Sequence, residues 1–326
     1  MPPPFKTKNT NQLMNISPEI QKRLICPQTK RPLIQVGNAL ETADDHAIRY
    51  PITQGIPVLI NEQNSIFDIK DFIQDKDTTF NLHKSKTQQW VEKVMPEIGM
   101  SIKTAANYQD LITRLPKQAK ILVVGGSIMG GGMQPIYDNP EFEIIGSDVS
   151  HGELTSLICD AHDIPFANET FDCVIIQAVL EHVIDPTRCV EECHRVLKKD
   201  GIVYAETPFM QQVHMKQFDF MRFTHLGHRR LFRQFDELSS GPAGGPGMVM
   251  AWSYLHFLRS FTNHATTRRA VILFAHLTGF FWKYFDYLLI DKPGAYDASS
   301  GYFFMGKRSE SILSDRELVQ QFKGIQ

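Results

Sequence analysis

The stretch that most constrains the fold of this chain runs from Phe171 to Pro186 and reads FDCVIIQAVLEHVIDP. Its apolar centre, 174–176, is β-branched throughout, which is typical of a strand buried inside a parallel sheet. Asp185 and Pro186 then begin a helix, because proline in the first helical turn loses no hydrogen bond. The letters KDG at 199–201 end that helix, and the apolar run 202–205 follows. The stretch therefore predicts a buried strand, a short loop, a helix, a tight turn and a second buried strand.

Together with the letters CHRVLKKDGIVY at 193–204, this stretch resembles the fourth and fifth strands of class I S-adenosylmethionine (SAM) methyltransferases. It is most similar to the methyltransferase type 11 family, in which phrases such as LEHV-x-DP and RVLK-x-GG recur. The resemblance implies an α/β, Rossmann-like fold with a doubly wound, mostly parallel sheet of about seven strands. A small N-terminal β module and a helical insertion are expected to extend that sheet. The resemblance also implies SAM as cofactor and methyl transfer as the reaction.

Length, charge and cysteine content narrow the class of protein. A chain of 326 residues predicts two units, or one domain with extensions. A net charge of −2 without a long basic block does not indicate a nucleic-acid surface. Five cysteines fit a reducing cytoplasm better than a disulfide scaffold. The N-terminus lacks the apolar core of a signal peptide, and the longest apolar run, 270–282, is shorter than the roughly 20 residues that span a bilayer. We therefore expect a cytoplasmic protein with no nucleic-acid partner.

Changes in pattern along the chain predict five segments. They are a flexible N-terminus at 1–16, a small β module at 17–60, a helical linker or cap at 61–118, a methyltransferase domain at 119–310 and a C-terminal tail at 311–326. Within the domain, residues 241–297 are expected to form a helical insertion that begins with a Gly/Pro loop. Apolar spacing of three and four at 90–95 and 102–115 predicts helices in the linker.

The small module is expected to have no bound metal. Its letters CPQT at 26–29 and YPITQGIPVLI at 50–60 resemble a zinc-ribbon-like family that includes the activating subunit of certain tRNA and protein methyltransferases. That family has a second cysteine where this chain has Thr29. Cys26 and His46 alone cannot make a four-ligand zinc site. We interpret the module as a degenerate zinc ribbon whose metal ligands are lost; an unrelated β-hairpin extension is the alternative.

A glycine-rich turn and a later acid predict a nucleoside site. The letters KILVVGGSIMGGG at 120–132 indicate a strand and a turn in which glycine lets the backbone approach a ligand. Asp148 ends the next predicted strand, where an acid can bind ribose hydroxyls. A NAD-binding turn would look alike, so an oxidoreductase is an alternative that the strand-four and strand-five phrases disfavour.

The resemblance assigns SAM contacts to eight residues. They are Gly125, Gly126, Ser127, Asp148, Asp160, Ala161, His162 and Gln177. The family has an acid inside its first strand, where this chain has Val123. That departure keeps a second function open: a non-catalytic SAM-fold module that acts through protein partners.

Candidates for the chemistry follow the fourth and fifth strands, where α/β sheets bind ligands. Methyl transfer needs alignment of the acceptor, and needs a base when a hydroxyl loses its proton. We predict His182 and His214 as catalytic residues. Glu181, Asp219, Arg222 and His225 are the predicted substrate-binding residues. Each has a structural alternative, as a helix cap, a core hydrogen-bonding group or a surface ion pair.

The expected acceptor is an oxygen or nitrogen of a small molecule, a glycan or a lipid-linked compound. Residues 250–290 are rich in Trp, Phe and Leu. They predict a helical lid over the acceptor or, alternatively, a peripheral contact with a membrane surface.

Overall fold

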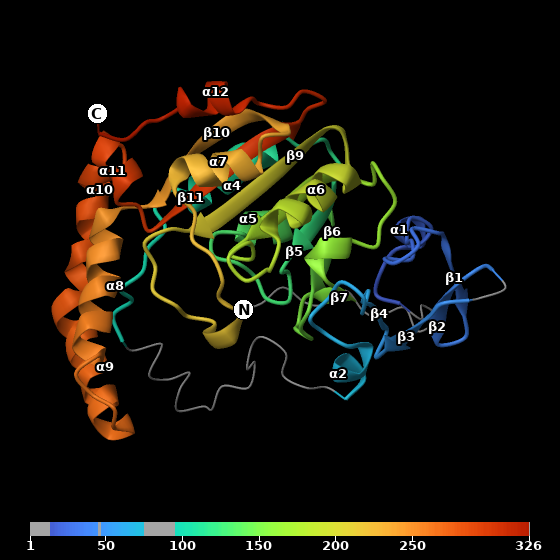
Figure 1. Cartoon of the computed structure of the whole chain (residues 1–326), viewed down its shortest axis with the longest axis horizontal. Coiled ribbons are helices and arrows are strands. Elements are labelled where there is room, and N and C mark those ends of the chain that lie inside the picture. Colours follow the sequence, from blue (N-terminus) through green and yellow to red (C-terminus); the bar gives the residue numbers. More distant parts are fainter. Residues whose placement is uncertain (1–13, 45–46, 75–94, 326) are drawn as a thin grey trace.

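A computed structural model describes residues 14–44, 47–74 and 95–325. Within these residues one mixed sheet of 11 strands runs across the molecule in the order β1-β2-β3-β4-β7-β6-β5-β8-β9-β11-β10 (Figure 1). The strands are β1 Leu33–Val36, β2 Ala39–Thr42, β3 Arg49–Thr53, β4 Ile56–Leu59, β5 Lys120–Val124, β6 Glu143–Asp148, β7 Thr155–Cys159, β8 Phe171–Gln177, β9 Leu197–Pro208, β10 Phe235–Gly244 and β11 Gly301–Arg308.

The helices include several that are only one turn long. The α-helices are α1 Pro18–Gln21, α2 Ile69–Ile73, α4 Thr104–Arg114, α5 Gln134–Tyr137, α6 Pro186–Val196, α7 His225–Leu231, α8 Pro246–Arg259, α9 Ala265–Gly279, α10 Asp286–Leu289, α11 Pro293–Asp297 and α12 Asp315–Val319. The 3₁₀ turns are η1 Ala161–Asp163, η2 Lys216–Phe218 and η3 Phe280–Phe285.

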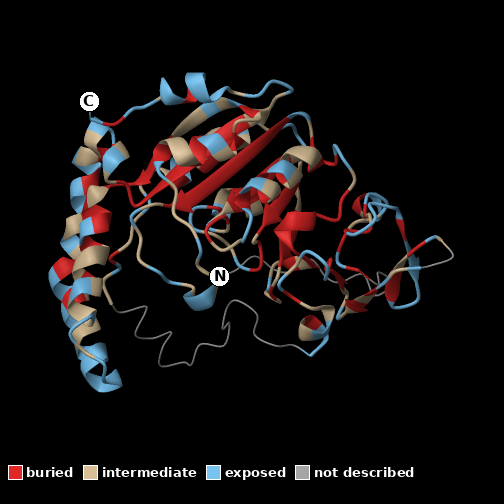
Figure 2. Ribbon diagram, viewed as in Figure 1, coloured by how far each residue is buried: buried red, intermediate tan, exposed pale blue. Residues whose placement is uncertain are grey.

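The central part of the sheet confirms the Rossmann-like prediction. Strands β7-β6-β5-β8-β9 pair in parallel, and β11 and β10 complete this part in antiparallel pairing. Side chains of β5 alternate between two cores: Leu122 and Val124 pack with α6 residues, whereas Ile121 and Val123 pack with α4 residues. Both faces are therefore covered, which explains why the central strands are mostly buried and rich in apolar residues (Figure 2).

The sheet is larger than predicted, because the N-terminal module continues it. Strand β4 pairs in parallel with β7, with Val58 opposite Ile158 and Leu59 opposite Cys159. The module also shares its core with the central sheet: Cys26 belongs to the same buried cluster as α6 residues. The expectation of a seven-stranded sheet is thus wrong in number, since four further strands extend one edge.

The structure differs from the predicted segments at three places. Met14 and Ile16 are buried, so the chain packs before residue 17. Residues 241–244, predicted as loop, form the end of β10 and pair with β11. In the expected tail, α12 packs on α7 and Asp315 pairs with Arg230 at 3.3 Å. The predicted helix at 102–115 corresponds to α4, whereas residues 1–13, His46 and most of the helix predicted at 90–95 lie outside the described residues.

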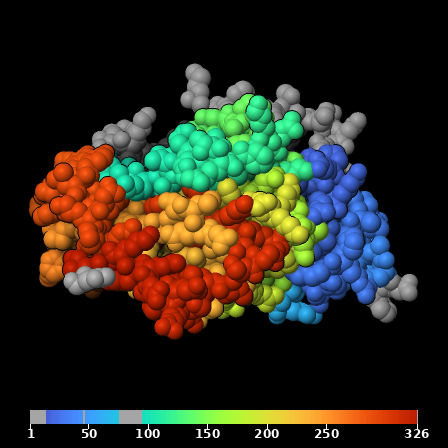
Figure 3. Space-filling view, turned by 90° about the horizontal axis from the view of Figure 1, so that it is seen from above, coloured from blue at the N-terminus to red at the C-terminus, as the bar shows by residue number. Residues whose placement is uncertain are grey.

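The helical insertion lies between β10 and β11, at the opposite end of the molecule from the module (Figures 1 and 3). Its attachment is anchored by Asp286, which is fully buried and accepts bonds from the amides of Gly245, Gly247 and Met248 at the start of α8. In the part of the chain that the structure describes, no helix is long and apolar enough to cross a membrane.

Candidate functional site

A cavity of about 610 Å³ opens at the carboxyl ends of the parallel strands. Residues that end or follow β5, β6, β7, β8 and β9 line it, and Met248 of α8 and Ala243 of β10 line it on the insertion side. This is the edge at which doubly wound sheets bind ligands, because the loops that follow the strands diverge there.

The glycine turn after β5 forms one wall. Gly125 has a φ of +74°, and a Cβ there would meet Val179 Cγ2 at 2.3 Å, so a side chain is excluded on both counts. Gly125 and Ser127 line the cavity. Gly126 lies behind it, where a Cβ would meet the Val123 carbonyl oxygen at 2.8 Å. Gly126 therefore lets β5 and β6 pack closely and does not contact the cavity.

Asp148 ends β6 and lines the cavity while being only 7% exposed. Its Oδ2 accepts a hydrogen bond from the Ser127 amide at 3.1 Å, which ties the acid to the glycine turn. Burial raises the pKa of the Asp148 carboxyl, and the bonds from Ser127 oppose that rise. An acid fixed at this point is positioned to accept hydrogen bonds from vicinal hydroxyls.

Asp160 and His162 form a fixed unit beside β7. The Asp160 carboxylate accepts bonds from the His162 amide at 3.0 Å and from Ser65 Oγ at 2.6 Å, and it also pairs with His162 Nδ1. The other ring nitrogen of His162 accepts a bond from the Asp185 amide at 3.0 Å. Burial alone would raise the pKa of Asp160, but His162 and Ser65 lower it. Both residues line the cavity, as does Ala161, so the structure brings this predicted trio to the site.

A hydrogen-bond network centred on Glu206, which the predicted site residues did not include, lines the cavity together with the predicted Gln177. Glu206, at the end of β9, is buried and accepts bonds from Thr104 Oγ1 at 2.7 Å, from Gln177 Nε2 at 2.8 Å and from the Tyr204 hydroxyl. Burial raises the pKa of this carboxyl. Glu206 lines the same cavity as Val123, the position where the resembling family has its acid. The signal was visible in the sequence as an acid directly after the fifth apolar strand.

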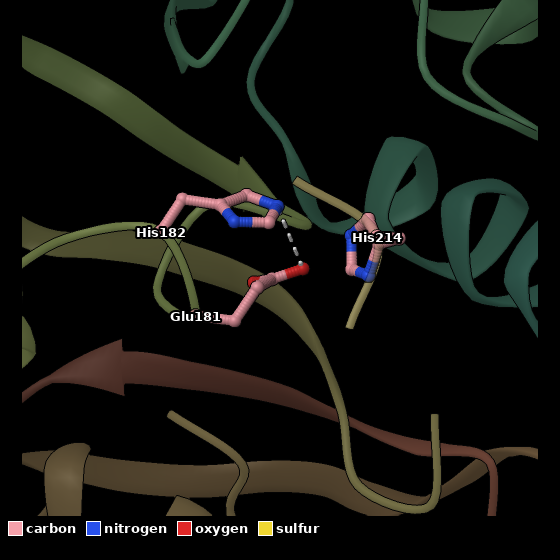
Figure 4. Close-up of side chains that lie close together, drawn as sticks. All are labelled: Glu181, His182 and His214. Atoms are coloured by element: carbon pink, nitrogen blue, oxygen red, sulfur yellow. Dashed lines mark ion pairs between the residues drawn. The ribbon is translucent and has the colours of Figure 1, made fainter. Parts of the chain in front are cut away.

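Glu181, His182 and His214 lie close together, with both histidines at the cavity (Figure 4). Glu181 Oε1 lies 3.6 Å from His182 Nε2, and the two histidine rings stand 4.9 Å apart at 76°. Burial raises the pKa of Glu181 to about 8 and lowers the pKa of His182 to about 4. Both histidines line the cavity, and Glu181 lies behind them.

The remaining predicted residues do not line the cavity. Asp219 and Arg222 form the predicted ion pair, with Nη2 to Oδ2 at 2.9 Å, and Asp219 accepts a bond from the His214 amide. Although burial opposes it, Arg222 holds the pKa of Asp219 well below its usual range. His225 lies on α7 against Tyr296 and Tyr302, with ring centroids 4.9 and 5.5 Å away. The pair thus supports a cavity residue, whereas His225 belongs to a separate aromatic cluster.

Comparison with known proteins finds a match to a methyltransferase family model and matches to two curated proteins. Residues 131–205 match the family described as methyltransferase domain. A tRNA (carboxymethyluridine(34)-5-O)-methyltransferase of Saccharomyces cerevisiae is 31% identical over 130 residues, covering 36% of this chain and 47% of the yeast protein. The chain thus spans about half the length of that relative. A UPF0434 protein of Vesicomyosocius okutanii is 44% identical over 48 residues, which are 15% of this chain and 80% of that protein.

Solved structures similar to the chain include two that carry methyltransferase names. One is phosphoethanolamine N-methyltransferase 2 of Haemonchus contortus, bound to phosphomonomethylethanolamine and S-adenosylhomocysteine, with a TM-score of 0.40, 14% identity and coverage of 63% of this chain and 53% of that chain. The other comes from a complex between the Haloferax volcanii Trm112 methyltransferase activator and a methyltransferase, with a TM-score of 0.39, 16% identity and coverage of 64% of this chain and 90% of that chain.

Proposed function

We propose that this chain, which contains a methyltransferase domain and a segment belonging to the UPF0434 family, is a SAM-dependent class I methyltransferase. The observation that carries the proposal is the convergence of the glycine turn, Asp148, the Asp160–His162 unit and Gln177 on one cavity at the carboxyl edge of the sheet. The proposed reaction moves a methyl group to an oxygen or nitrogen of the acceptor.

The residues present fit SAM in their chemistry. Asp148 offers a buried carboxylate for ribose hydroxyls, and Gly125 leaves backbone room that a Cβ would fill. Glu206 places an acid on the cavity floor, where an amino-acid ammonium group needs a partner and Val123 provides none. The bound cofactor supplies an electrophilic methyl group on a sulfonium. This chain's contribution is to hold that group, align the acceptor and exclude water.

His182 and His214 are the proposed residues for handling a proton of the acceptor. Both line the same cavity as Asp148 and Asp160. The Nδ1 of His182 donates to the Phe218 carbonyl oxygen at 2.7 Å, which leaves Nε2 with its lone pair. A neutral imidazole in that state accepts a proton from a hydroxyl or an amine.

The acceptor is proposed as a small molecule, a glycan or a lipid-linked compound. A tRNA nucleoside is a second candidate, favoured by the 31% identity to the yeast tRNA methyltransferase over 130 residues. The two classes are separated by incubating the protein with methyl-labelled SAM and either tRNA isolated from cells, which carries modified nucleosides, or a panel of hydroxyl- and amine-bearing metabolites. Label in tRNA alone would replace the small-molecule proposal.

A lipid surface is proposed as a partner of the α8–α9 hairpin. Large apolar side chains are exposed on it, including Phe257 at 61%, Phe261 at 73% and Phe274 at 55%. Residues 246–285 contain no Asp or Glu, and Arg259, Arg268 and Arg269 lie near the tip. Exposed aromatic groups beside cations suit an anionic membrane interface.

Vesicle sedimentation tests this surface. We expect binding to phosphatidylglycerol vesicles and not to phosphatidylcholine vesicles, with loss of binding in a Phe257→Ser, Phe274→Ser double variant. Lys216→Gln, on η2 away from the hairpin, serves as the charge control. Equal binding by the double variant and the parent protein would contradict the proposal.

A further inference from the structure

In the cluster of Glu181, His182 and His214, three atoms of the kind that bind metal ions lie close together, and a role in proton transfer does not explain this geometry. Each residue presents one ligand-type atom, and these atoms lie within 4.8 Å of one another. Glu181 and His182 come from the loop after β8, and His214 comes from the loop after β9. The fold therefore brings a carboxylate and two imidazoles together from two neighbouring strand ends.

The Glu181 carboxylate is buried and makes no hydrogen bond with another residue of the described chain. Its exposure is 0%, and neither carboxylate oxygen accepts a hydrogen bond from another described residue. Its ion pair with His182, from Oε1 to Nε2, measures 3.6 Å, which is beyond hydrogen-bond distance. Buried polar groups are nearly always satisfied, so a buried carboxylate without a hydrogen bond indicates a group that the chain itself does not supply.

Both histidine rings are oriented by contacts that their Nδ1 atoms make with neighbouring residues. His182 Nδ1 lies 2.7 Å from the Phe218 carbonyl oxygen, and His214 Nδ1 lies 3.3 Å from both the Gln212 carbonyl oxygen and Asp219 Oδ2. Asp219 is in turn fixed by Arg222 and by the His214 amide. Histidines that bind metals are commonly oriented in this way, with a carbonyl or carboxylate on one ring nitrogen and the metal on the other. Figure 4 shows the rings and the carboxylate facing one another.

We propose that Glu181, His182 and His214 bind one divalent transition-metal ion of the Zn²⁺ type. Two imidazole nitrogens and one carboxylate oxygen are a recognised donor set for zinc with an open coordination position. Ligand distances of about 2.0–2.2 Å require the three atoms, which lie within 4.8 Å of one another, to converge on a shared ion. Because both histidines line the cavity, the open position faces the acceptor side.

The role of this ion rests on the proposed function. An acceptor hydroxyl bound at the open position would have a lower pKa and would lose its proton to water. The oxygen would then form a bond to the methyl carbon of SAM while the carbon–sulfur bond breaks and its electron pair stays on sulfur. In that arrangement the two histidines would act as ligands, and this role would replace the proton-accepting role proposed for them above.

Cobalt titration of the full-length protein tests the site. The protein is treated with a chelator, dialysed and titrated with Co²⁺, and binding is followed by calorimetry and by visible absorption. We expect one site per chain, and at least a tenfold loss of affinity in Glu181→Gln and in His214→Asn. Cys26→Ser and His264→Asn are matched controls that should bind as the parent does, since Cys26 is buried in the module and His264 is exposed at the hairpin.

Two results would overturn the proposal. One is the absence of a stoichiometric Co²⁺ site in the parent protein. The other is affinity within about twofold of the parent in both Glu181→Gln and His214→Asn, with melting curves showing that the variants fold. His214 is partly exposed, so that variant is expected to fold even where Glu181→Gln does not. The titration uses neither SAM nor an acceptor, so failure of this site and failure of methyl transfer are distinguishable.

Discussion

The polar network around Asp163 joins the N-terminal module to the central sheet, and we predict that its removal lowers the stability of both together. Asp163 is 4% exposed. Its Oδ2 accepts bonds from the side-chain amides of Asn61 at 3.0 Å and Asn64 at 3.1 Å, and its Oδ1 pairs with Arg188 at 2.7 Å. Lys30 of the module adds a longer pair at 3.4 Å.

Asp163→Ala leaves the buried Asn61 amide and the Arg188 guanidinium without their acceptor. The Arg188 and Lys30 side chains are 38% and 41% exposed, so each pair contributes about 1 kcal/mol or less, whereas the buried Asn61 amide left without its acceptor costs about 1–3 kcal/mol. We therefore expect the free energy of unfolding to fall by about 2–4 kcal/mol for Asp163→Ala. For Asp163→Asn, which keeps an acceptor for the amides, a smaller loss of about 1.5–3 kcal/mol is expected.

Urea unfolding followed by circular dichroism measures these differences. Asp200→Asn is the control, because its pair with Lys307 is largely exposed and should contribute below about 1 kcal/mol. The parent protein should unfold in one transition. Unchanged stability in Asp163→Ala, or a separate early transition of the module, would refute the reasoning.

Four further predictions concern other parts of the chain. Burial lowers the pKa of His228 to about 3, so below about pH 6.5 the unfolded state binds more protons than the folded state, and the free energy of unfolding falls as the pH falls. Between pH 7 and pH 5 this histidine should account for about 2 kcal/mol of that fall, and His228→Phe should abolish this share in urea unfolding. Glu206→Gln should weaken SAM binding by about 10- to 100-fold in calorimetry if its charge replaces the acid absent at Val123; equal affinity would remove it from the site. His182→Ala and His214→Ala should lower turnover far more than SAM affinity, and normal turnover with earlier melting would make both structural. Cys26→Ser should leave the metal content by elemental analysis unchanged, because Cys26 Sγ contacts the Tyr50 hydroxyl at 3.2 Å; zinc lost in this variant would contradict the degenerate-module interpretation.

The central fold could be predicted because its signals are local and strong. Val174 to Ile176 are buried on both faces of the sheet, so every position is apolar and the strand is visible in the sequence. Pro186 and the turn at 199–201 likewise act within a few residues. The eleven-stranded extent could not be predicted, because the pairing of Val58 with Ile158 joins positions 100 apart and depends on packing that no local pattern encodes.

The residues of the candidate site could be predicted from the sequence where a single side chain lies at the end of a single strand. Asp148 and Asp160 follow their strands directly and line the cavity. His225 was placed on the acceptor side because it follows the same loop as Arg222, but α7 begins there and directs it into the Tyr296–Tyr302 cluster. The Glu181 carboxylate makes no hydrogen bond with another described residue, and His214 forms an ion pair with Asp219. Both facts depend on how the side chains of two loops are placed in space, which cannot be predicted from the sequence.

SAM binding to the parent protein and to Asp148→Asn tests the central claim most directly. Asp148 is buried at the cavity, so the loss of its charge-assisted bonds to a ribose should cost about 1.5–3 kcal/mol, which is about 10- to 150-fold in Kd. Calorimetry with SAM and with its demethylated product should show binding to the parent, weakened binding to Asp148→Asn and unchanged binding to Asp200→Asn. No binding to the parent, or equal binding to Asp148→Asn, would contradict the account.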